Sequence, residues 1–190
     1  MGLLEPNQQV GNYRVMRKIG AGGMGEVWEA EHAQIGSRAA LKVLLPKYSH
    51  EPEVAARFFN EARAVNVVNH PSMVRVFDFG MLGNGSCYIA MEYLDGEPLS
   101  KRIERKKRLG ADALRVARQT ASALAAAHSK GIIHRDLKPD NLFLINDPEA
   151  AGGERVKILD FGIAKMVRQP TPDETAPART SPDVFMGTAV

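Results

Sequence analysis

The amino-acid sequence predicts an α+β fold made of two lobes that differ in secondary structure. Five strand-like segments and one helical segment precede the Asp95–Gly96 pair. After that pair the chain becomes rich in alanine and mostly helical in pattern. Its 190 residues, of which 44% are hydrophobic, are enough for two small cores on either side of a cleft. We therefore expect a leader at 1–11, a first lobe at 12–95 and part of a second lobe at 96–190.

The first lobe is predicted to contain five strands and one helix. The strand patterns are found at 13–19, 26–32, 38–45, 73–79 and 87–93. A Gly-Asn-Gly turn at 83–85 joins the last two of these strands. Pro52 begins a helical pattern that continues to about Val67, with Phe58, Ala62 and Val65 on one apolar stripe.

The second lobe is predicted to combine a long helix with a hairpin. Residues 111–129 contain many alanines and no proline, which predicts a helix that Gly131 ends. Two short apolar runs at 142–145 and 156–159, joined by a turn-rich stretch, predict the hairpin. From Arg168 onward several prolines interrupt the chain, a composition typical of a flexible segment.

Charge and cysteine content exclude several classes of protein. The net charge is only +3, and the Lys and Arg residues are scattered, which argues against a nucleic-acid partner. The one dense basic cluster, at 101–108, is interpreted as the solvated face of a helix. A single cysteine, Cys87, allows no disulfide framework, which favours a reducing, cytoplasmic location. No window approaches the run of about 20 apolar residues that a membrane helix needs.

Three glycines lie between the first two predicted strands. Gly20, Gly22 and Gly25 form a G-x-G-x-x-G pattern. In a dinucleotide-binding fold such glycines lead into a helix, whereas here the residues after Gly25 favour a strand. A glycine loop between two strands can cover nucleotide phosphates, because a backbone without side chains approaches them closely and offers its N–H groups. The alternative interpretation is a plain hairpin turn.

Lys42 and Glu61 are a candidate pair. Alternation along the third strand places Lys42 on the same face as Ala40. Glu61 falls within the apolar stripe of the helix, and a carboxylate that faces a core needs a partner. Lys42 is a suitable partner, and the pair would hold the lysine toward the α- and β-phosphates of a nucleotide. A snorkelling lysine and a glutamate at the helix rim are the alternative.

The strongest signal is the loop sequence HRDLKPDN at 134–141. In this loop Asp136 can accept or orient the proton of a substrate hydroxyl, and Lys138 can neutralise charge on a transferred phosphoryl group. Asn141 offers a carbonyl oxygen suited to Mg²⁺. Asp160, which begins an Asp-Phe-Gly tripeptide 19 residues after Asn141, supplies a carboxylate for the same metal.

Together these motifs resemble the bacterial branch of the eukaryotic-like serine/threonine protein kinases. The resemblance runs from about residue 13 to the last residue and rests on residues 20–27, 40–42, 61, 134–141, 160–162 and 187–188. It implies a two-lobed protein-kinase-like fold with a five-stranded N-lobe and a helical C-lobe. The resemblance also implies that the C-lobe would be incomplete here, because the family continues with an Ala-Pro-Glu motif. It also implies ATP and Mg²⁺ as cofactors and proteins with Ser or Thr acceptors as substrates, since Lys138 is typical of serine/threonine kinases.

The resemblance further implies where the nucleotide is held. Met91 would be the gatekeeper, and the backbone of residues 92–94 would be the hinge that binds adenine. Ala40, Val27 and Phe143 would enclose the base. The complete set expected at the nucleotide is Ile19, Gly20, Ala21, Gly22, Gly23, Met24, Gly25, Glu26, Val27, Ala40, Lys42, Met91, Glu92, Leu94 and Phe143.

Residues 160–188 resemble an activation loop. Thr180 is the first candidate for phosphorylation, beside Thr175 and Ser181, and Arg135 could pair with the added phosphate. Self-association for autophosphorylation is a further expectation. The leading hypothesis is an enzyme that phosphorylates proteins on Ser or Thr. The alternatives are a non-catalytic ATP-binding or regulatory module and a small-molecule kinase, of which Lys138 disfavours the second.

Overall fold

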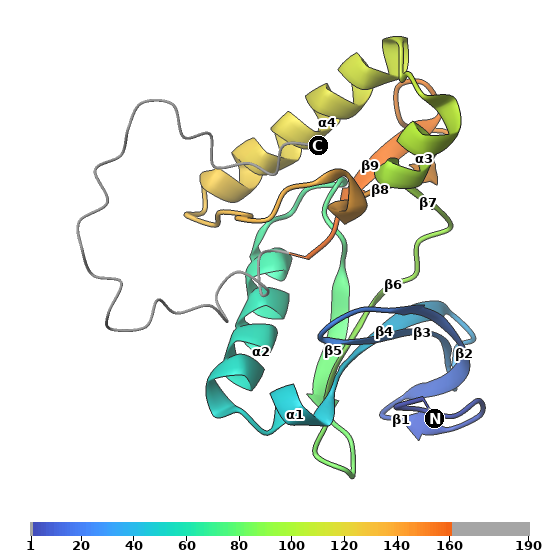
Figure 1. Ribbon diagram of the computed structural model, residues 1–190, viewed down its shortest axis with the longest axis vertical. Helices are drawn as coiled ribbons and strands as arrows, with labels where there is room; N and C mark the ends of the chain where they lie inside the picture. The colour runs from blue at the N-terminus through green and yellow to red at the C-terminus, as the bar shows by residue number, and fades with distance from the viewer. Residues whose placement is uncertain (1, 161–190) are drawn as a thin grey trace.

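The computed structural model of the chain describes residues 2–160 and is drawn in Figure 1. The predicted motif residues Phe161 and Gly162 and the hydroxyls of the expected activation loop lie outside these residues. Figure 1 shows two lobes, one built around a curled antiparallel sheet and the other around a long helix and a small sheet. The predicted division into two lobes of different class is confirmed.

The first lobe contains a six-stranded sheet in the order β1-β2-β3-β4-β6-β5. Its strands are β1 (Gln9–Val10), β2 (Tyr13–Ala21), β3 (Gly25–His32), β4 (Arg38–Leu44), β5 (Val76–Met81) and β6 (Cys87–Glu92). The five predicted strands are present, although β5 begins three residues later than the expected 73. The reason is that Met73 is buried in the core between the lobes and bridges to Ile158 instead.

The sixth strand, β1, comes from the segment that was expected to be a leader. It pairs antiparallel with β2, so that Gln9 faces Arg14 and Val10 faces Tyr13. Gly11 makes the reversal possible, since its φ of 54° lies in the left-handed region. Leu4 and Val10 are each only 2% exposed, and this burial explains why the segment is ordered against the sheet.

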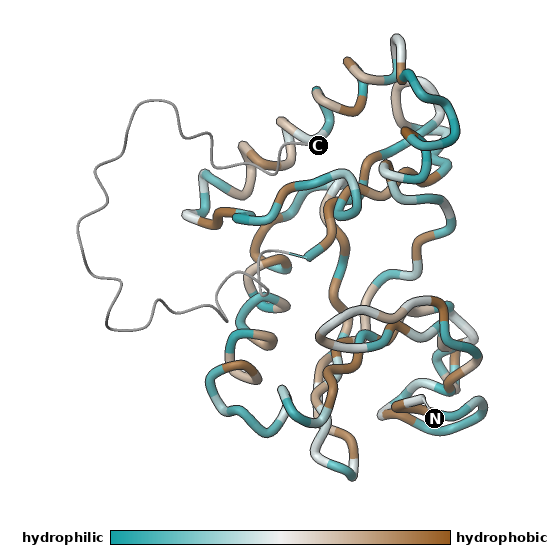
Figure 2. The backbone as a smooth tube through the Cα atoms, in the orientation of Figure 1, coloured by the Kyte–Doolittle hydropathy of each residue, from teal (hydrophilic) through white to brown (hydrophobic). Residues whose placement is uncertain are grey.

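Two helices follow β4. The short α1 (Pro46–Ser49) leads into α2 (Pro52–Val67), whose bounds agree with the predicted helix. Proline in the first turn lacks only an N–H that would be unpaired there, so it begins the helix at no cost. Figure 2 shows hydrophobic and hydrophilic residues alternating along α2, in agreement with its one buried stripe of Val54, Phe58, Ala62 and Val65.

The second lobe is formed by β7 (Gly96–Pro98), α3 (Leu99–Lys106), α4 (Ala111–His128), the 3₁₀ turn η1 (Pro139–Asn141), β8 (Leu142–Asn146) and β9 (Glu154–Ile158). The predicted long helix and the hairpin β8–β9 are confirmed, and the basic cluster lies largely on α3. Strand β7 was not predicted. It pairs with β8 because Gly96 permits close approach of the two backbones. An added Cβ at Gly96 would lie 1.9 Å from the Leu144 carbonyl oxygen.

Among the described residues no helix is both long and apolar enough to span a membrane.

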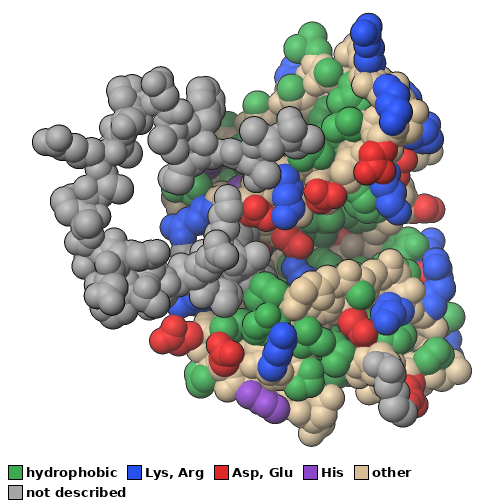
Figure 3. Space-filling model, viewed as in Figure 1, with side chains coloured by type: hydrophobic (Ala, Val, Ile, Leu, Met, Phe, Trp, Pro, Cys, Tyr) green, Lys and Arg blue, Asp and Glu red, His purple; other side chains and the backbone are tan. Residues whose placement is uncertain are grey.

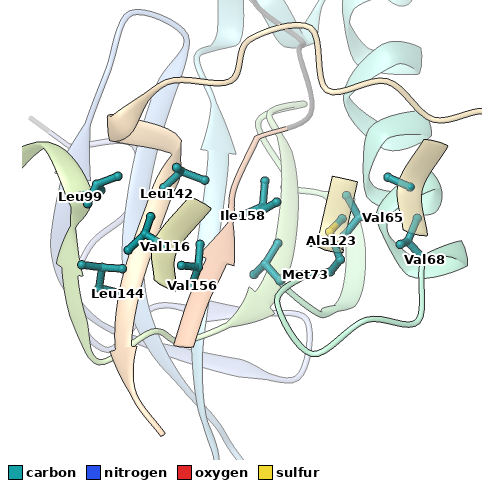
Figure 4. Close-up of a cluster of buried hydrophobic side chains, with 12 residues drawn as sticks. Val65, Val68, Met73, Leu99, Val116, Ala123, Leu142, Leu144, Val156 and Ile158 are labelled. Carbon is teal, nitrogen blue, oxygen red and sulfur yellow. The ribbon is translucent and has the colours of Figure 1, made fainter. Parts of the chain in front are cut away.

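One hydrophobic core joins the two lobes. Figure 4 shows Val65 and Val68, at the end of α2, beside side chains from the hairpin β8–β9 and from α4. The buried members of this core are Val65, Val68, Met73, Val74, Leu99, Val116, Ala123, Ala127, Leu142, Leu144, Val156 and Ile158. The opposite part of α2 packs Phe58 and Ala62 against Leu44 and Ile89 of the large sheet. Helix α2 therefore couples the sheet to the second lobe.

Candidate active site

A cleft of about 570 Å³ lies between the lobes. The glycine loop forms one wall and the 134–141 loop forms the other, and Figure 3 shows acidic and basic side chains meeting across this hollow. The volume lies within the range of small-molecule sites. The predicted site residues that line the cleft are Gly20, Ala21, Gly22, Gly23, Met24, Gly25, Val27, Lys42, Asp136, Lys138, Asn141 and Asp160.

The glycine loop connects β2 to β3 as an antiparallel turn, as the sequence predicted. Its ends are closed by a hydrogen bond of 2.9 Å from the Gly22 N–H to the Gly25 carbonyl oxygen. A Cβ at Gly25 would lie 2.2 Å from the Val43 carbonyl oxygen, so this glycine is required for β3 to pair with β4. A Cβ at Gly22 or Gly23 would meet no described atom within 4 Å, so the backbone there is open to the cleft. The loop thus suits close approach to phosphates.

His134 fixes the start of the 134–141 loop. It is buried, and its Nε2 lies 2.8 Å from the Leu159 carbonyl oxygen. The Asp136 backbone N–H points at Nδ1 over 3.3 Å, so Nδ1 accepts and Nε2 carries the proton. Burial lowers the pKa of His134, which keeps the ring neutral. The next residue, Arg135, has a φ of 63°, an uncommon backbone conformation for a residue with a side chain.

Asp136 is held between a lysine and an amide. Lys138 Nζ lies 3.0 Å from Asp136 Oδ2. Asn141 Nδ2 donates to the Asp136 carbonyl oxygen at 2.8 Å and to Oδ2 at 3.3 Å. Because the nitrogen of the Asn141 amide is used in this way, its Oδ1 is the atom that can face a cation.

Lys42 lies in the middle of the large sheet, opposite Val27 on β3 and Ile89 on β6. Its Nζ forms an ion pair with Asp160 Oδ1, across 118 residues of sequence. Asp160 has a φ of 47°. It directly follows Leu159, whose backbone N–H donates to the Asn141 carbonyl oxygen at 2.9 Å. Asp160 and Asn141 therefore bring hard oxygen ligands, of the kind Mg²⁺ prefers, to the same cleft.

The predicted pair of Lys42 with Glu61 is not formed in this conformation. Lys42 is bonded to Asp160 instead, and both Glu61 carboxylate oxygens are buried without a hydrogen-bond partner among the described residues. Burial raises the pKa of Glu61 to about 8; the nearby Lys42 charge opposes this rise and Asp160 adds to it. Helix α2 holds Glu61 at the core because Phe58 and Ala62, its neighbours on the stripe, are packed against the sheet.

Other residues of the expected nucleotide-binding set do not line this cleft. They are Ile19, Glu26, Ala40, Met91, Glu92, Leu94 and Phe143, whereas Val27, which was expected to enclose the base, does line it. Ala40 pairs with Met91 inside the sheet. The Glu92 carboxylate points to the second lobe, where it accepts a hydrogen bond of 2.8 Å from Lys157.

Several lining residues were missed by sequence reasoning. Val43, Leu44, Pro98 and Asp140 also line the cleft. Asp140 could have been found, since it lies inside the 134–141 motif. Lys157 was also missed, although a lysine between Val156 and Ile158 in a predicted strand signals a buried ion pair.

Comparison with known proteins agrees with this geometry. The chain matches the protein kinase domain family over residues 13–189. Serine/threonine-protein kinase Pkn1 of Myxococcus xanthus is 42% identical over 186 residues, which cover 95% of this chain and 26% of Pkn1. Serine/threonine-protein kinase PknA of Mycobacterium tuberculosis is 42% identical over 184 residues, which cover 94% of this chain and 40% of PknA.

Solved structures show the same likeness. The Mycobacterium tuberculosis PknI kinase domain superimposes with a TM-score of 0.69 at 32% identity, over 84% of this chain and 62% of that one. The chain spans less than half the length of the two curated relatives.

Proposed function

Because the chain belongs to the serine/threonine protein kinase family, we propose that it transfers the γ-phosphoryl group of MgATP to Ser or Thr hydroxyls of protein substrates. One observation carries the proposal. Asp136, Asn141 and Asp160 line the same cleft as the open glycine loop and Lys42, although these groups are far apart in sequence. Phosphoryl transfer depends mainly on positioning and on electrostatic stabilisation, and this arrangement offers both.

Each polar group has a role in the proposed reaction. Lys42 and the glycine loop bind the phosphates, and Asp160 with Asn141 Oδ1 would hold Mg²⁺, which shields the phosphate charges when bound. The bond from the γ-phosphorus to the bridging oxygen of ADP breaks while a bond to the substrate oxygen forms. Asp136 orients the substrate hydroxyl and accepts its proton, and Lys138 offsets negative charge on the transferred group.

The first test is the dependence of transfer on metal. The purified chain, and the same chain extended through the remainder of a kinase domain, are incubated with γ-labelled ATP and a Ser/Thr-containing protein acceptor. Label transfer is expected with Mg²⁺ and not after chelation. Asp160→Asn should raise the Mg²⁺ concentration for half-maximal transfer at least about tenfold, since even residues that only support metal ligands contribute about 10–100-fold in affinity. Nucleotide binding without any label transfer in the extended chain would favour the non-catalytic ATP-binding module.

Control by phosphorylation is a second part of the proposal. Arg135 is exposed beside Asp136 and can pair with a phosphate. We expect the active kinase to phosphorylate Thr180, or its neighbours Thr175 and Ser181, through contact between two copies. Mass spectrometry after incubation with MgATP locates the phosphate, and the rate of modification should rise with protein concentration. Full activity after replacement of all three hydroxyls by alanine would show that this loop is not the switch.

The proposed location is the cytoplasm, where ATP and a reducing environment occur together. The single cysteine, Cys87, is buried and unpaired, in agreement with that environment.

A further inference from the structure

The segment 2–10 is built into the first lobe. Leu4 is buried against the face of the large sheet that also buries Val15 and Trp28. The backbone continues the sheet, because Asn7 N–H donates to the Val15 carbonyl oxygen at 2.8 Å and Val15 N–H donates to the Gln8 carbonyl oxygen at 2.9 Å. Val15 belongs to β2, the strand that enters the glycine loop, so the segment is bonded directly to that strand.

Glu26 connects this segment to the glycine loop. It is the second residue of β3, immediately after Gly25. Its Oε2 accepts the Leu3 backbone N–H at 2.8 Å and the Trp28 indole N–H at 3.0 Å. Its Oε1 lies 3.1 Å from Lys18 Nζ, on the strand that enters the loop. One carboxylate thus ties the N-terminal segment to both stems of the glycine loop.

The carboxylate of Glu26 stays ionised in this position. Burial by itself would raise its pKa, but the hydrogen bonds from Leu3, Lys18 and Trp28 outweigh burial and hold the pKa below its usual value. Because three donors converge on it, the side chain is directed to the N-terminal segment, and Glu26 does not line the nucleotide cleft.

The stems are the part of the loop that the structure holds in place. Glu26 faces Ala21 across the β2–β3 pair, and Gly25 lies against the Val43 backbone. At the tip, Gly22 and Gly23 have open space where side chains would be, so side-chain packing cannot position them. The position of Gly22 and Gly23 over the cleft therefore depends on how firmly the residues around them are held, which are the two stems and Met24, whose carbonyl oxygen accepts the Leu45 N–H at 2.9 Å.

We propose that residues 2–10 position the glycine loop for nucleotide binding through Glu26, which acts as a positioning residue and does not touch the nucleotide. This inference rests on the proposed ATP-binding function. Without the segment the loop samples more conformations. The apparent affinity for nucleotide is then the intrinsic affinity multiplied by the fraction of time that the loop spends in the binding conformation. A fraction of about one tenth raises the dissociation constant about tenfold.

Two variants separate positioning from direct contact. Deletion of residues 2–8 removes Leu3 and Leu4 and leaves Glu26 in place, whereas Glu26→Ala removes the carboxylate alone. Both are expected to raise the KM for ATP about tenfold, with little change in kcat or in the KM for the protein substrate. Glu26→Gln keeps an acceptor for the Leu3 and Trp28 N–H groups and should restore much of the affinity. Glu31→Ala is the matched control, because Glu31 lies on the same strand, at the end remote from the loop. Among the described residues its carboxylate forms an ion pair only with Arg14, at 3.5 Å.

Two readouts do not need activity. Trp28 is the only tryptophan and is 4% exposed. It donates to Glu26 and shares a buried cluster with Leu4 and Val10 of the segment, so its fluorescence maximum should shift to longer wavelength in the deletion and in Glu26→Ala. Amide hydrogen exchange at residues 20–25 should become faster in both variants and stay unchanged in Glu31→Ala. Circular dichroism confirms that each variant is folded.

The outcomes are distinct. If Glu26→Ala weakens nucleotide binding but the deletion does not, Glu26 acts on the nucleotide directly and the proposal is overturned. Unchanged exchange at residues 20–25 in the folded deletion variant overturns it as well. If the wild-type chain binds no nucleotide while exchange at the loop still depends on residues 2–8, the proposed function fails and the mechanical coupling stands.

Discussion

Replacement of Asp136 by asparagine is expected to lower kcat for phosphoryl transfer by about 10²–10⁴-fold, the usual contribution of a positioned acid–base group. Asparagine has the same shape and keeps an oxygen for the Asn141 amide, but it cannot accept the proton of the substrate hydroxyl. The dissociation constant of ATP should change little, because the carboxylate of Asp136 is held by Lys138 and Asn141 on the wall opposite the glycine loop. Steady-state kinetics and calorimetric nucleotide titration measure the two quantities.

Asp78→Asn is the matched control for this experiment. Asp78 lies on β5, outside the cleft, and its Oδ1 accepts the Phe79 N–H at 2.8 Å, a bond that the asparagine oxygen can keep. Its kcat should equal that of the wild type. Activity of Asp136→Asn within a few-fold of wild type would remove Asp136 from the catalytic role.

The second large effect is expected in the stability of the chain as a function of pH. The folded-state pKa of Glu61 is about 8 against an ordinary value of 4.5. A raised pKa means that folding favours the protonated carboxyl. The contribution of Glu61 to the stability of the fold is therefore fully present below pH 4.5 and is lost as the pH rises through 8. The difference between 8 and 4.5, at about 1.4 kcal/mol per pKa unit, corresponds to a decrease of up to about 5 kcal/mol in the free energy of unfolding.

Glu61→Gln tests this directly, since the amide stays neutral throughout the range. Urea unfolding at pH 5 and pH 8 should show a smaller pH dependence than in the wild type, and the variant should be the more stable protein at pH 8. Glu53→Gln is the control, because Glu53 lies on the same helix with its side chain 78% exposed and should leave the pH dependence unchanged. Equal pH dependence for Glu61→Gln and the wild type would show that Glu61 is already paired or hydrated in solution.

The same substitution is expected to act in the opposite direction on catalysis. If Lys42 exchanges Asp160 for Glu61 when nucleotide and metal are bound, Glu61→Gln stabilises the free chain and lowers phosphotransfer. In a double-mutant cycle with Lys42→Met, the loss in the double variant should be much smaller than the sum of the single losses. Additive losses would show that the two residues act independently.

Much of the architecture could be predicted because its signals are local. The bounds of α2 follow from Pro52 and from the spacing of Phe58, Ala62 and Val65, and the hairpin β8–β9 follows from two apolar runs around a turn. Strand β7 could not be found in this way. Its three residues include a proline and show no alternation, and only the approach of the β8 backbone to Gly96 makes them a strand.

The sequence by itself identified the functional groups of the candidate site. Asp136, Lys138, Asn141 and Asp160 were identified from residue type and spacing, and all of them line one cleft together with the glycine loop. Such motifs can be recognised because the proposed reaction needs particular functional groups in a fixed order along the chain.

Only the tertiary structure decided which charged groups are partners. Lys42 meets Asp160 and not Glu61, and Glu26 turns from the nucleotide to Leu3 in a segment that the sequence had suggested was a leader. The reason is physical: an ion pair or hydrogen bond forms only between atoms within about 4 Å, and burial decides whether a charge is tolerated. Both conditions depend on the packing of segments that are distant in sequence, as with Lys42 and Asp160, which are 118 positions apart, and no local pattern of residues encodes their contact.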